Sequence, residues 1–331
     1  LMLGIMEHGD VSNVTTGPKL DWDGKTKPAD ATQVYVTGTS AAIAQAITDA
    51  LQKGDVYIDD ALNMAGVDRF TIPKGRTLYV TGNVTDTNKL TVNGTLLVGS
   101  DLTTTAAATF NNVGVKGDWH VNVSATVNTD AVATVEGDVI VASGQKLTVN
   151  GKLYAANLGA TGVDADLEVG TTGHVEISGN IVTTGEITVT GANSLIVKGD
   201  ISCATLTVGS GTNAGRVEAA NINATTSVTV AVAGSSVTVT NTITAPTVTV
   251  TDAALTANKV TGALDVNTTT AGNSVSVTVP TLVGTLDTSG VTGSGTVSAG
   301  TSSDSAVTVG STIESDVTLN GTVTFSNGTT I

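Results

Sequence analysis

The 331-residue chain has few cysteines and few aromatic residues, and both shortages limit the fold. Its one cysteine, Cys203, excludes an intrachain disulfide, and we expect it to be a small buried core residue. Aromatic residues make up 3% of the chain, and after Tyr154 Phe325 stands alone. The core must therefore be built from aliphatic side chains, which disfavours folds that centre on large rings.

Charge is also scarce, and one sign dominates. Charged residues make up 13% of the chain, 14 basic against 29 acidic, with a pI near 4.3. Binding to nucleic acid needs basic clusters that neutralise phosphate, and docking on anionic lipid needs them too. No Lys or Arg follows Lys259. We therefore expect no nucleic-acid partner and no attraction to an anionic membrane.

Long apolar runs are missing as well. No run approaches the 18 apolar residues of a transmembrane helix, so the sequence predicts no membrane span. The first residue is Leu rather than Met, which indicates a processed chain or a fragment. An acidic, Lys-poor, Thr-rich composition is typical of secreted microbial surface proteins, and we expect an extracellular, cell-surface location.

Catalytic patterns are absent from the sequence. There is no G-x-S-x-G, no H-E-x-x-H and no phosphate-binding loop, and the three His and three Arg are scattered. An enzyme acting on polysaccharide would need clustered carboxylates or a base beside a metal. We expect no enzymatic activity and no required cofactor.

The abundant residues are those of β structure. The chain has 61 Thr, 47 Val and 38 Gly. Thr and Val are β-branched and favour strands, and Gly favours turns. The stretch KLTVNGTLLVG at 89–99 has a close copy, KLTVNGKLYA, at 146–155. Similar alternating units with a Gly step recur at irregular spacing, which indicates a degenerate repeat of short strands.

One helix interrupts this pattern, in the segment 39–54. Ser40 is a suitable N-cap, and Gly54 is placed to end the helix. Ile43, Ile47 and Leu51 fall at i, i+4 and i+8 on one face. The preceding residues 1–38 are irregular, and we interpret them as an N-terminal extension able to act as an intersubunit strand.

Many short strands with Gly turns fit either a parallel β-solenoid or a β-sandwich. The helix followed by FTIPKGRTLYV resembles the start of right-handed parallel β-helix proteins of secreted microbial surfaces. The residues that carry the likeness are Ile72, Pro73, Gly75, Leu78 and Val80. The resemblance implies an all-β solenoid over 55–331 with 39–54 as a capping helix, and it transfers no catalytic residue. Division near residue 220, with a C-terminal β-sandwich after it, remains an alternative.

The clearest candidate metal ligands lie in GVDADLEVG. In a strand, Asp164, Asp166 and Glu168 point to one face, where three carboxylates repel one another unless a cation lies between them. Oxygen ligands of this kind suit Ca²⁺. The competing interpretation is a solvated acidic face, because the segment matches neither the EF-hand loop nor the nonapeptide Ca²⁺ repeat.

The two apolar termini lead to the functional hypothesis. We expect the apolar residues of LMLGIM and of the last strand to meet between subunits, by head-to-tail strand addition. The residues assigned to this assembly contact are Leu1, Met2, Leu3, Ile5, Met6, Val323, Phe325 and Ile331. The hypothesis is a non-enzymatic homopolymer forming a filament, sheath or S-layer-like surface layer.

Two other functional classes remain open. One is an adhesin stalk or viral tail-spike-like module that binds glycans, and the other is a β-helix carbohydrate-active enzyme. Trp22 and Trp119 are the only tryptophans available for stacking on a sugar. A broad sugar-stacking surface is thus disfavoured, whereas a single site is not.

Overall fold

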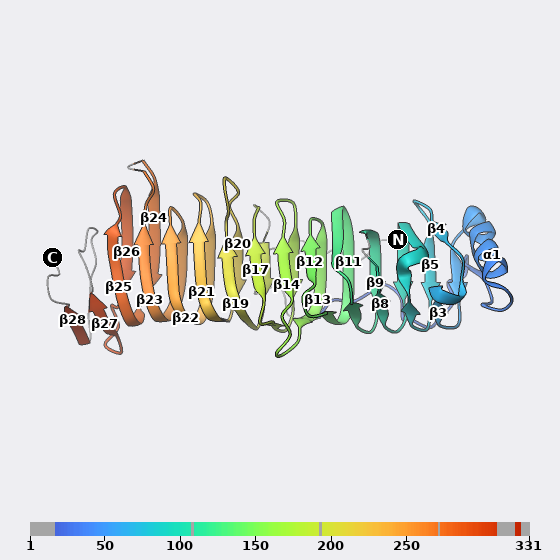
Figure 1. Cartoon of the computed structure of the whole chain (residues 1–331), viewed down its shortest axis with the longest axis horizontal. Coiled ribbons are helices and arrows are strands. Elements are labelled where there is room, and N and C mark those ends of the chain that lie inside the picture. The colour runs from blue at the N-terminus through green and yellow to red at the C-terminus, as the bar shows by residue number, and fades with distance from the viewer. Residues whose placement is uncertain (1–16, 107–108, 192–193, 271, 310–321, 326–331) are drawn as a thin grey trace. The chain divides into compact units, whose positions relative to one another are not determined.

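The protein folds as a parallel β-solenoid of about 14 turns, as a computed structural model shows (Figure 1). Strands hold 58% of the residues and helices 7%, which confirms the all-β prediction and the resemblance to β-helix proteins. The structure describes residues 17–106, 109–191, 194–270, 272–309 and 322–325.

The chain divides into two compact units. Among the described residues, unit 1 holds 17–167 and 173–179, and unit 2 holds 168–172 and 180 onward. The strand β14 (Asp166–Val169) falls across this division in the sequence.

The described residues of unit 1 form one helix, two short 3₁₀ turns and fourteen strands besides β14. The helix is α1 (Ser40–Lys53), and the 3₁₀ turns are Met64–Gly66 and Thr87–Lys89. The strands are β1 (Thr32–Gln33), β2 (Val56–Ile58), β3 (Leu62–Asn63), β4 (Phe70–Ile72), β5 (Thr77–Val80), β6 (Val84–Thr85), β7 (Leu90–Val98), β8 (Leu102–Thr104), β9 (Thr109–Val115), β10 (Trp119–Val121), β11 (Ala125–Val141), β12 (Lys146–Val149), β13 (Lys152–Gly159) and β15 (His174–Ile177).

Unit 2 contains the remaining strands. They are β16 (Ile181–Val182), β17 (Glu186–Val189), β18 (Ser194–Val197), β19 (Asp200–Val208), β20 (Arg216–Ala219), β21 (Asn221–Ala231), β22 (Ser236–Thr251), β23 (Ala254–Asn267), β24 (Ser274–Val279), β25 (Thr281–Gly290), β26 (Ser294–Ala299), β27 (Ala306–Val309) and β28 (Thr322–Phe325). Their recorded pairings within the unit, from β17–β19 to β27–β28, are parallel. The described part of unit 2 is therefore solenoid and not the alternative β-sandwich.

Each coil of unit 1 contributes to three stacked parallel faces. One face stacks β2, β5 and the second half of β7, and then β9, β11, β13 and β15. A second face stacks β3, β6, β8 and β10, and a third begins with β4 and the first half of β7. We call the first stack face 1, because the candidate site lies on it.

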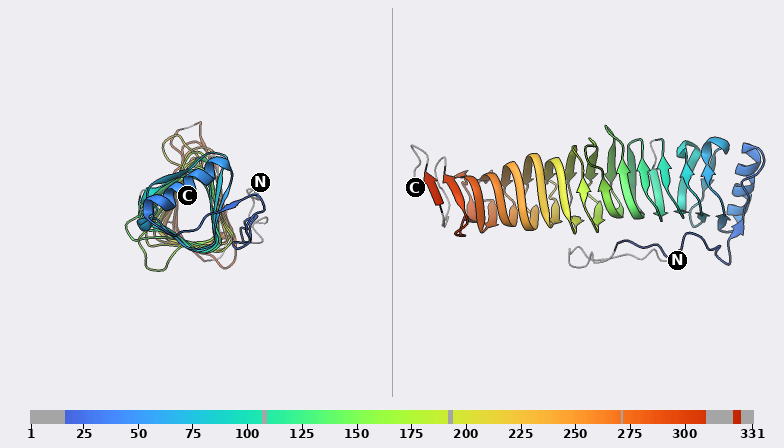
Figure 2. Two further views of the ribbon diagram at one scale, coloured as in Figure 1. Left: turned by 90° about the vertical axis from the view of Figure 1, so that its right-hand side faces the viewer. Right: turned by 90° about the horizontal axis from the view of Figure 1, so that it is seen from below.

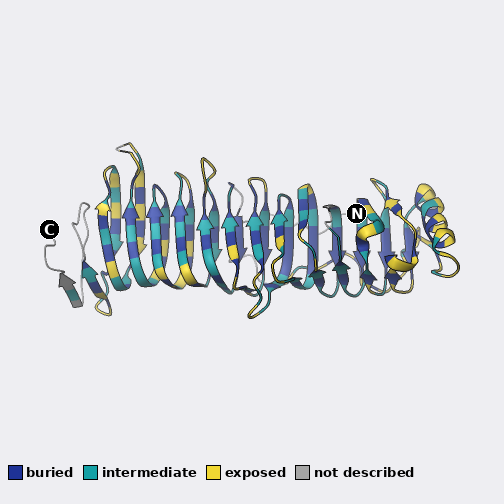
Figure 3. Cartoon of the chain, in the orientation of Figure 1, coloured by how far each residue is buried: buried dark blue, intermediate teal, exposed yellow. Residues whose placement is uncertain are grey.

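Side chains alternate between the coil interior and the outside, as expected for strands (Figure 3). Val, Leu and Ile fill the interior, which matches the aliphatic core expected from the composition. A few large rings are exceptions: Trp119 has 0% exposure and meets the buried Phe110 edge to face, with ring centroids 5.9 Å apart. Its Nε1 donates to the hydroxyl of Thr104 at 3.2 Å. The indole is therefore buried in the core together with a partner for its polar N–H.

The Gly steps form corners between parallel strands instead of hairpin turns. At one corner of unit 1, Asn83, Asp101 and Asp118 form a ladder in which each side chain accepts the backbone N–H of the equivalent residue in the next coil, at 2.8–3.0 Å. A Cβ on Gly117 would overlap the Asp101 carboxylate. At this corner, hydrogen bonds from the side chains of one coil to the backbone of the next take the place of local turn hydrogen bonds. The Asn93-Gly94 step lies within β7, between the half that pairs with β4 and the half that pairs with β5.

The helix α1 lies at the first coil of unit 1, where it buries Ile43, Ile47 and Leu51 (Figure 1). It begins at Ser40, and the N-cap is Thr39, whose hydroxyl accepts the Ala42 N–H at 3.3 Å. The prediction of Ser40 as N-cap is thus wrong by one residue. Both residues are good caps, and the backbone of Thr39 is the extended one.

Candidate functional site

Face 1 carries apolar side chains on its outer side, which is unusual for a solenoid strand. The outward residues Tyr57, Tyr79 and Leu97 are paired in register and are buried, and Gly114 continues the column. An outward ring can be buried only if something covers it. The cover is the segment 17–31 of the same chain, which we call the strap.

The strap runs along the outside of unit 1 and then leads into β1 (Figure 2). Within the strap, Leu20 contacts Glu136, Gly24 lies against Gly99, and Lys25 contacts Tyr57. The strap therefore crosses the coils toward α1, from later coils to earlier ones in the sequence. It ties together strands that are adjacent in the stack but distant in the sequence.

Trp22 anchors the middle of the strap. It lies edge-on to Tyr79 with ring centroids 5.3 Å apart, in a buried cluster that includes Tyr57 and Leu97. Its Nε1 donates to the Thr26 carbonyl at 2.8 Å. Tyr57 donates its hydroxyl to the Lys25 carbonyl at 2.6 Å. Both rings thus satisfy their polar atoms while their apolar surfaces are removed from water.

Glycines on the outside of the coils make room for the strap. A Cβ on Gly114 would lie 2.7 Å from Leu20 Cδ2, and a Cβ on Gly99 would overlap the Gly24 carbonyl oxygen. Gly24 itself has φ +83°, a left-handed conformation that glycine adopts without strain. Gly99 and Gly114 are therefore needed for the close approach of two chain segments, whereas Gly24 also lies in a turn of the strap.

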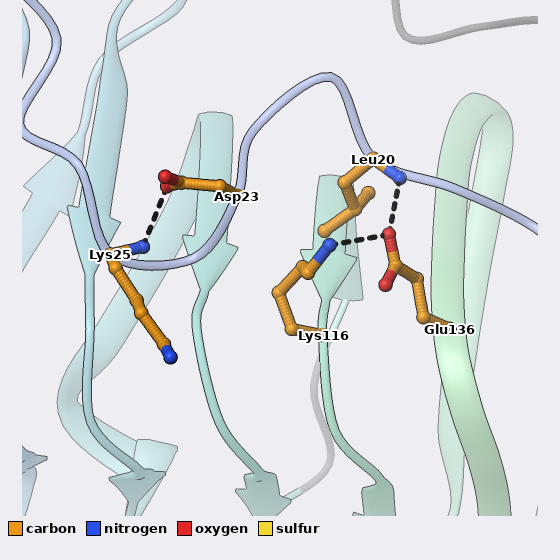
Figure 4. Close-up of polar contacts among 5 residues, drawn as sticks. All are labelled: Leu20, Asp23, Lys25, Lys116 and Glu136. Atoms are coloured by element: carbon orange, nitrogen blue, oxygen red, sulfur yellow. Dashed lines mark hydrogen bonds and ion pairs between the residues drawn. The ribbon is translucent and has the colours of Figure 1, made fainter.

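A charged pair holds the strap backbone at the next coil (Figure 4). The Lys116 ammonium contacts Glu136 Oε1 at 2.8 Å, and the same oxygen accepts the Leu20 N–H at 2.7 Å. Both charged side chains are about one-quarter exposed or less. A hydrogen bond to an ionised acceptor is stronger than a neutral one. We call this arrangement the Glu136 clamp.

Asp23 closes a turn within the strap (Figure 4). Its Oδ1 accepts the N–H groups of Lys25 and Thr26 at 2.8 and 2.7 Å, and its Oδ2 accepts the Thr26 hydroxyl at 2.5 Å. The Thr26 hydroxyl is the main reason that the pKa of Asp23 is lowered from 3.8 to about 2, followed by the backbone N–H groups of Thr26 and Lys25.

This pKa predicts how the turn responds to acid. A lowered folded-state pKa stabilises the turn above the ordinary value of 3.8, and the contribution is lost as the pH falls toward 2. The substitution Thr26→Val removes the hydroxyl donor but keeps the N–H, so we expect the pKa of Asp23 to rise toward its ordinary value. An NMR titration of the Asp23 carboxyl carbon measures this pKa in the unaltered protein and in Thr26→Val. Identical titration curves would contradict the assignment.

The predicted calcium ligands do not form a metal centre in the described residues. Asp164 is exposed and precedes β14, while Asp166 and Glu168 are half-buried within that strand. No group of three or more His, Cys, Asp or Glu positioned to hold a metal occurs among the described residues. The calcium site therefore stays a prediction without structural support.

Most of the predicted assembly residues lie outside the described residues, namely Leu1, Met2, Leu3, Ile5, Met6 and Ile331. Val323 is half-buried in β28 and pairs with Val307, and the backbone of Phe325 pairs with Val309. The intersubunit role of residues 1–38 is not tested, but the strap shows that 17–31 pack on their own unit.

Cys203 and both tryptophans are buried. Cys203 is 2% exposed, and burial raises the pKa of its thiol to about 12, which makes it unreactive. Trp22 and Trp119 are both buried, at 8% and 0% exposure. Neither tryptophan presents an open ring face to a sugar.

A polar groove of about 710 Å³ lies on another part of unit 1. It crosses successive coils and offers hydroxyl, amide and ammonium groups from Thr71, Lys74, Thr91, Asn93, Asn111 and Asn128. Asn111 Nδ2 donates to the Asn93 carbonyl at 2.8 Å, which holds part of the wall in place. The groove can form hydrogen bonds but lacks an aromatic platform.

The strap was not predicted, although the sequence contains a signal for it. The strands VYI, LYV and LLV, at 56–58, 78–80 and 96–98, hold three consecutive apolar residues, which breaks strict alternation. The middle residue must then point outward, so the outer face has to be covered. The sequence does not show which segment covers it.

Comparisons with family models, with curated proteins and with solved structures give no match to this chain. Within the described part of the chain, no helix is both long and apolar enough to cross a membrane. The functional argument therefore depends on the geometry of the two units.

Proposed function

We propose that this protein is a non-enzymatic structural protein that self-assembles into an extracellular filament, sheath or S-layer-like surface layer. Strand addition joins its subunits: the apolar N-terminal segment of one chain, donated as a strand, pairs with the last strand of the next. Backbone hydrogen bonds supply the contact, so no catalytic residue or cofactor is needed.

The single observation that carries the proposal is the strand edge in unit 2. β28 pairs in parallel with β27, and the described residues provide no strand for its other edge. An unpaired edge is a template for adding another strand. The first coil of unit 1 is different, because α1 packs against it, which makes the contact directional.

The test is negative-stain electron microscopy of the full chain beside a variant lacking residues 1–12. We expect ordered polymers from the full chain and none from the variant, because the donated strand is missing. A control variant with Leu1, Leu3 and Ile5 replaced by Ser keeps the length but loses the apolar side chains. Polymers that persist in the deletion variant would contradict the proposal.

The polar groove of unit 1 favours a second candidate, an adhesin stalk or tail-spike-like module that binds glycans. The groove has donors and acceptors spaced along successive coils, which suits an extended chain of hydroxyl-bearing sugars. Discrete particles from both the full chain and the deletion variant would favour this candidate.

A further inference from the structure

Several asparagines of the coils lie in the tripeptide Asn-x-Ser/Thr, the acceptor sequence for N-linked sugar. In a chain rich in Asn and Thr this tripeptide also occurs by chance, so the structure has to select among the copies. Because the acceptor sequence requires a hydroxyl, a transferase must reach both the Asn carboxamide and the hydroxyl two residues later. The asparagines of this kind among the described residues are Asn83, Asn93, Asn122, Asn223 and Asn267.

In two of these copies the tripeptide is part of the scaffold. Asn83 Oδ1 accepts the Asp101 N–H at 3.0 Å, in the corner ladder of unit 1. Asn267 is half-buried, and the Thr269 hydroxyl of its tripeptide donates to Asp252 Oδ2 at 2.5 Å. A transferase would have to break contacts between neighbouring coils to engage either copy.

The Asn122 tripeptide has an exposed asparagine but an occupied hydroxyl. Ser124 Oγ donates to Gln145 Oε1 at 3.1 Å and accepts the Lys146 N–H at 2.9 Å. The hydroxyl is thus used twice in holding the next coil.

The Asn93 tripeptide is divided between two faces of the coil. Asn93 is exposed and follows the part of β7 that pairs with β4. Thr95 is half-buried and begins the part that pairs with β5. The carboxamide and the hydroxyl therefore lie on different faces.

Asn223 in β21 meets both conditions (Figure 1). Ala224 is 5% exposed and points inward, so the side chains of Asn223 and Thr225 point outward together. Both residues are exposed, and neither side chain has a hydrogen-bond partner among the described residues. The carboxamide and the hydroxyl are therefore presented on one side of the strand.

The local backbone explains why this copy is free. The pairing of β21 with β19 and with β22 shifts register between Asn223 and Ser227, so the exposed Thr225 and Thr226 lie in a bulge outside both ladders. Asn221, in the regular ladder just before it, uses both its carboxamide nitrogen and its carboxamide oxygen in hydrogen bonds to neighbouring coils. The bulge releases from such bonds the residues that follow.

We propose that Asn223 is a site of N-linked glycosylation, modified by an oligosaccharide. A bond forms between Asn223 Nδ2 and the anomeric carbon of the sugar, and the bond from that carbon to a phosphate oxygen of an activated, phosphate-linked sugar donor breaks. The proton lost from the amide passes to the phosphate leaving group. The inference rests on the proposed function only for the extracellular location, which takes the chain past a glycosyltransferase.

Mass spectrometry of tryptic peptides, on protein purified from the organism that makes it, tests the site. Cleavage after Lys and Arg separates the five asparagines onto different peptides, and Asn223 has the acceptor tripeptide to itself on peptide 217–259. We expect this peptide to gain the mass of attached sugar residues, and peptides 77–89, 90–116 and 117–146 to keep their unmodified mass. A peptide 217–259 found at its unmodified mass alone would overturn the proposal, as would sugar on the other three peptides instead.

Variants made in the same organism identify the linkage. Thr225→Val removes the hydroxyl but keeps the β-branched shape, and we expect complete loss of the sugar from peptide 217–259. Thr225→Ser keeps a hydroxyl and should keep the sugar. The matched control is Thr226→Val, which changes the neighbouring exposed Thr of the same bulge outside the tripeptide. Sugar that persists in Thr225→Val would show attachment elsewhere in the peptide and would contradict the proposal.

The result is separable from the polymer test. An unmodified peptide 217–259 from a chain that forms polymers would overturn this inference and leave the proposed function standing. A modified peptide from a chain that forms no polymers would do the reverse.

Discussion

Replacing Trp22 by Ala should release the strap while leaving the coils folded. Trp22 is 92% buried but belongs to the cover and not to the coil interior. Its removal leaves a cavity against Tyr79 and abolishes the hydrogen bond from Nε1 to the Thr26 carbonyl. Trp→Ala at buried sites costs about 3–5 kcal/mol, and here that cost falls on docking of the strap. Limited trypsin digestion should then cut after Lys19 and Lys25 within the strap.

The matched control for this experiment is Trp22→Phe, which keeps a ring against Tyr79 and loses only the Nε1 donor. We expect it to resist trypsin far better than Trp22→Ala. The freed column of Tyr57, Tyr79 and Leu97 should also bind a hydrophobic dye, since these side chains become exposed together. Resistance of Trp22→Ala equal to that of the unaltered protein would show that Trp22 does not anchor the strap.

Replacing Trp119 by Ala should instead destabilise unit 1 itself. Trp119 is fully buried inside the coils, where it contacts Phe110 and donates to the Thr104 hydroxyl. We expect the free energy of unfolding of unit 1 to fall by about 3–5 kcal/mol, because the loss of a fully buried ring leaves a cavity in the core. Far-UV circular dichroism of the strands follows urea unfolding of the coils, because the remaining tryptophan, Trp22, reports on the strap.

Two comparisons make the Trp119 result specific. Trp119→Phe keeps most of the ring contact with Phe110 and should lose less than half as much stability as Trp119→Ala. Trp22→Ala should leave the unfolding midpoint of the coils nearly unchanged, since the strap is not part of the core. A Trp119→Ala protein that unfolds at the same urea concentration as the unaltered one would contradict its placement in the core.

Together, the two tryptophan variants separate two layers of stability in unit 1. The inner layer is the aliphatic core with its aromatic insertion, and the outer layer is the strap over face 1. In solenoids, each coil contacts mainly its neighbours, so stability is close to a sum of local terms. A strap that contacts several coils adds coupling between them, and we expect its release to lower the cooperativity of unfolding.

The candidate site was harder to predict than the fold, and the reasons differ from residue to residue. Tyr57, Tyr79 and Leu97 break the alternation in their strands, so a covered outer face was readable from the sequence. That Leu20 and Trp22 supply the cover was not. Neither lies in a periodic element, and each meets partners distant in the sequence, such as Tyr79 and Gly114. Similarly, Asp164, Asp166 and Glu168 share a sequence pattern, but whether carboxylates converge depends on how coils stack.

The sequence by itself determined the all-β class, the aliphatic core and the helix at 40–53, because period, composition and capping act over a few residues. The solenoid was favoured by the resemblance of residues 70–80 to β-helix proteins, and the structure excluded the β-sandwich alternative for the described part of unit 2. Only the tertiary structure decided that Gly-Asx steps are corners held by the next coil, that Gly99 and Gly114 leave room for the strap, and that Glu136 binds its backbone. These features depend on register between coils 17 to 25 residues apart and on a segment that crosses them. Local residue preferences do not specify such long-range contacts.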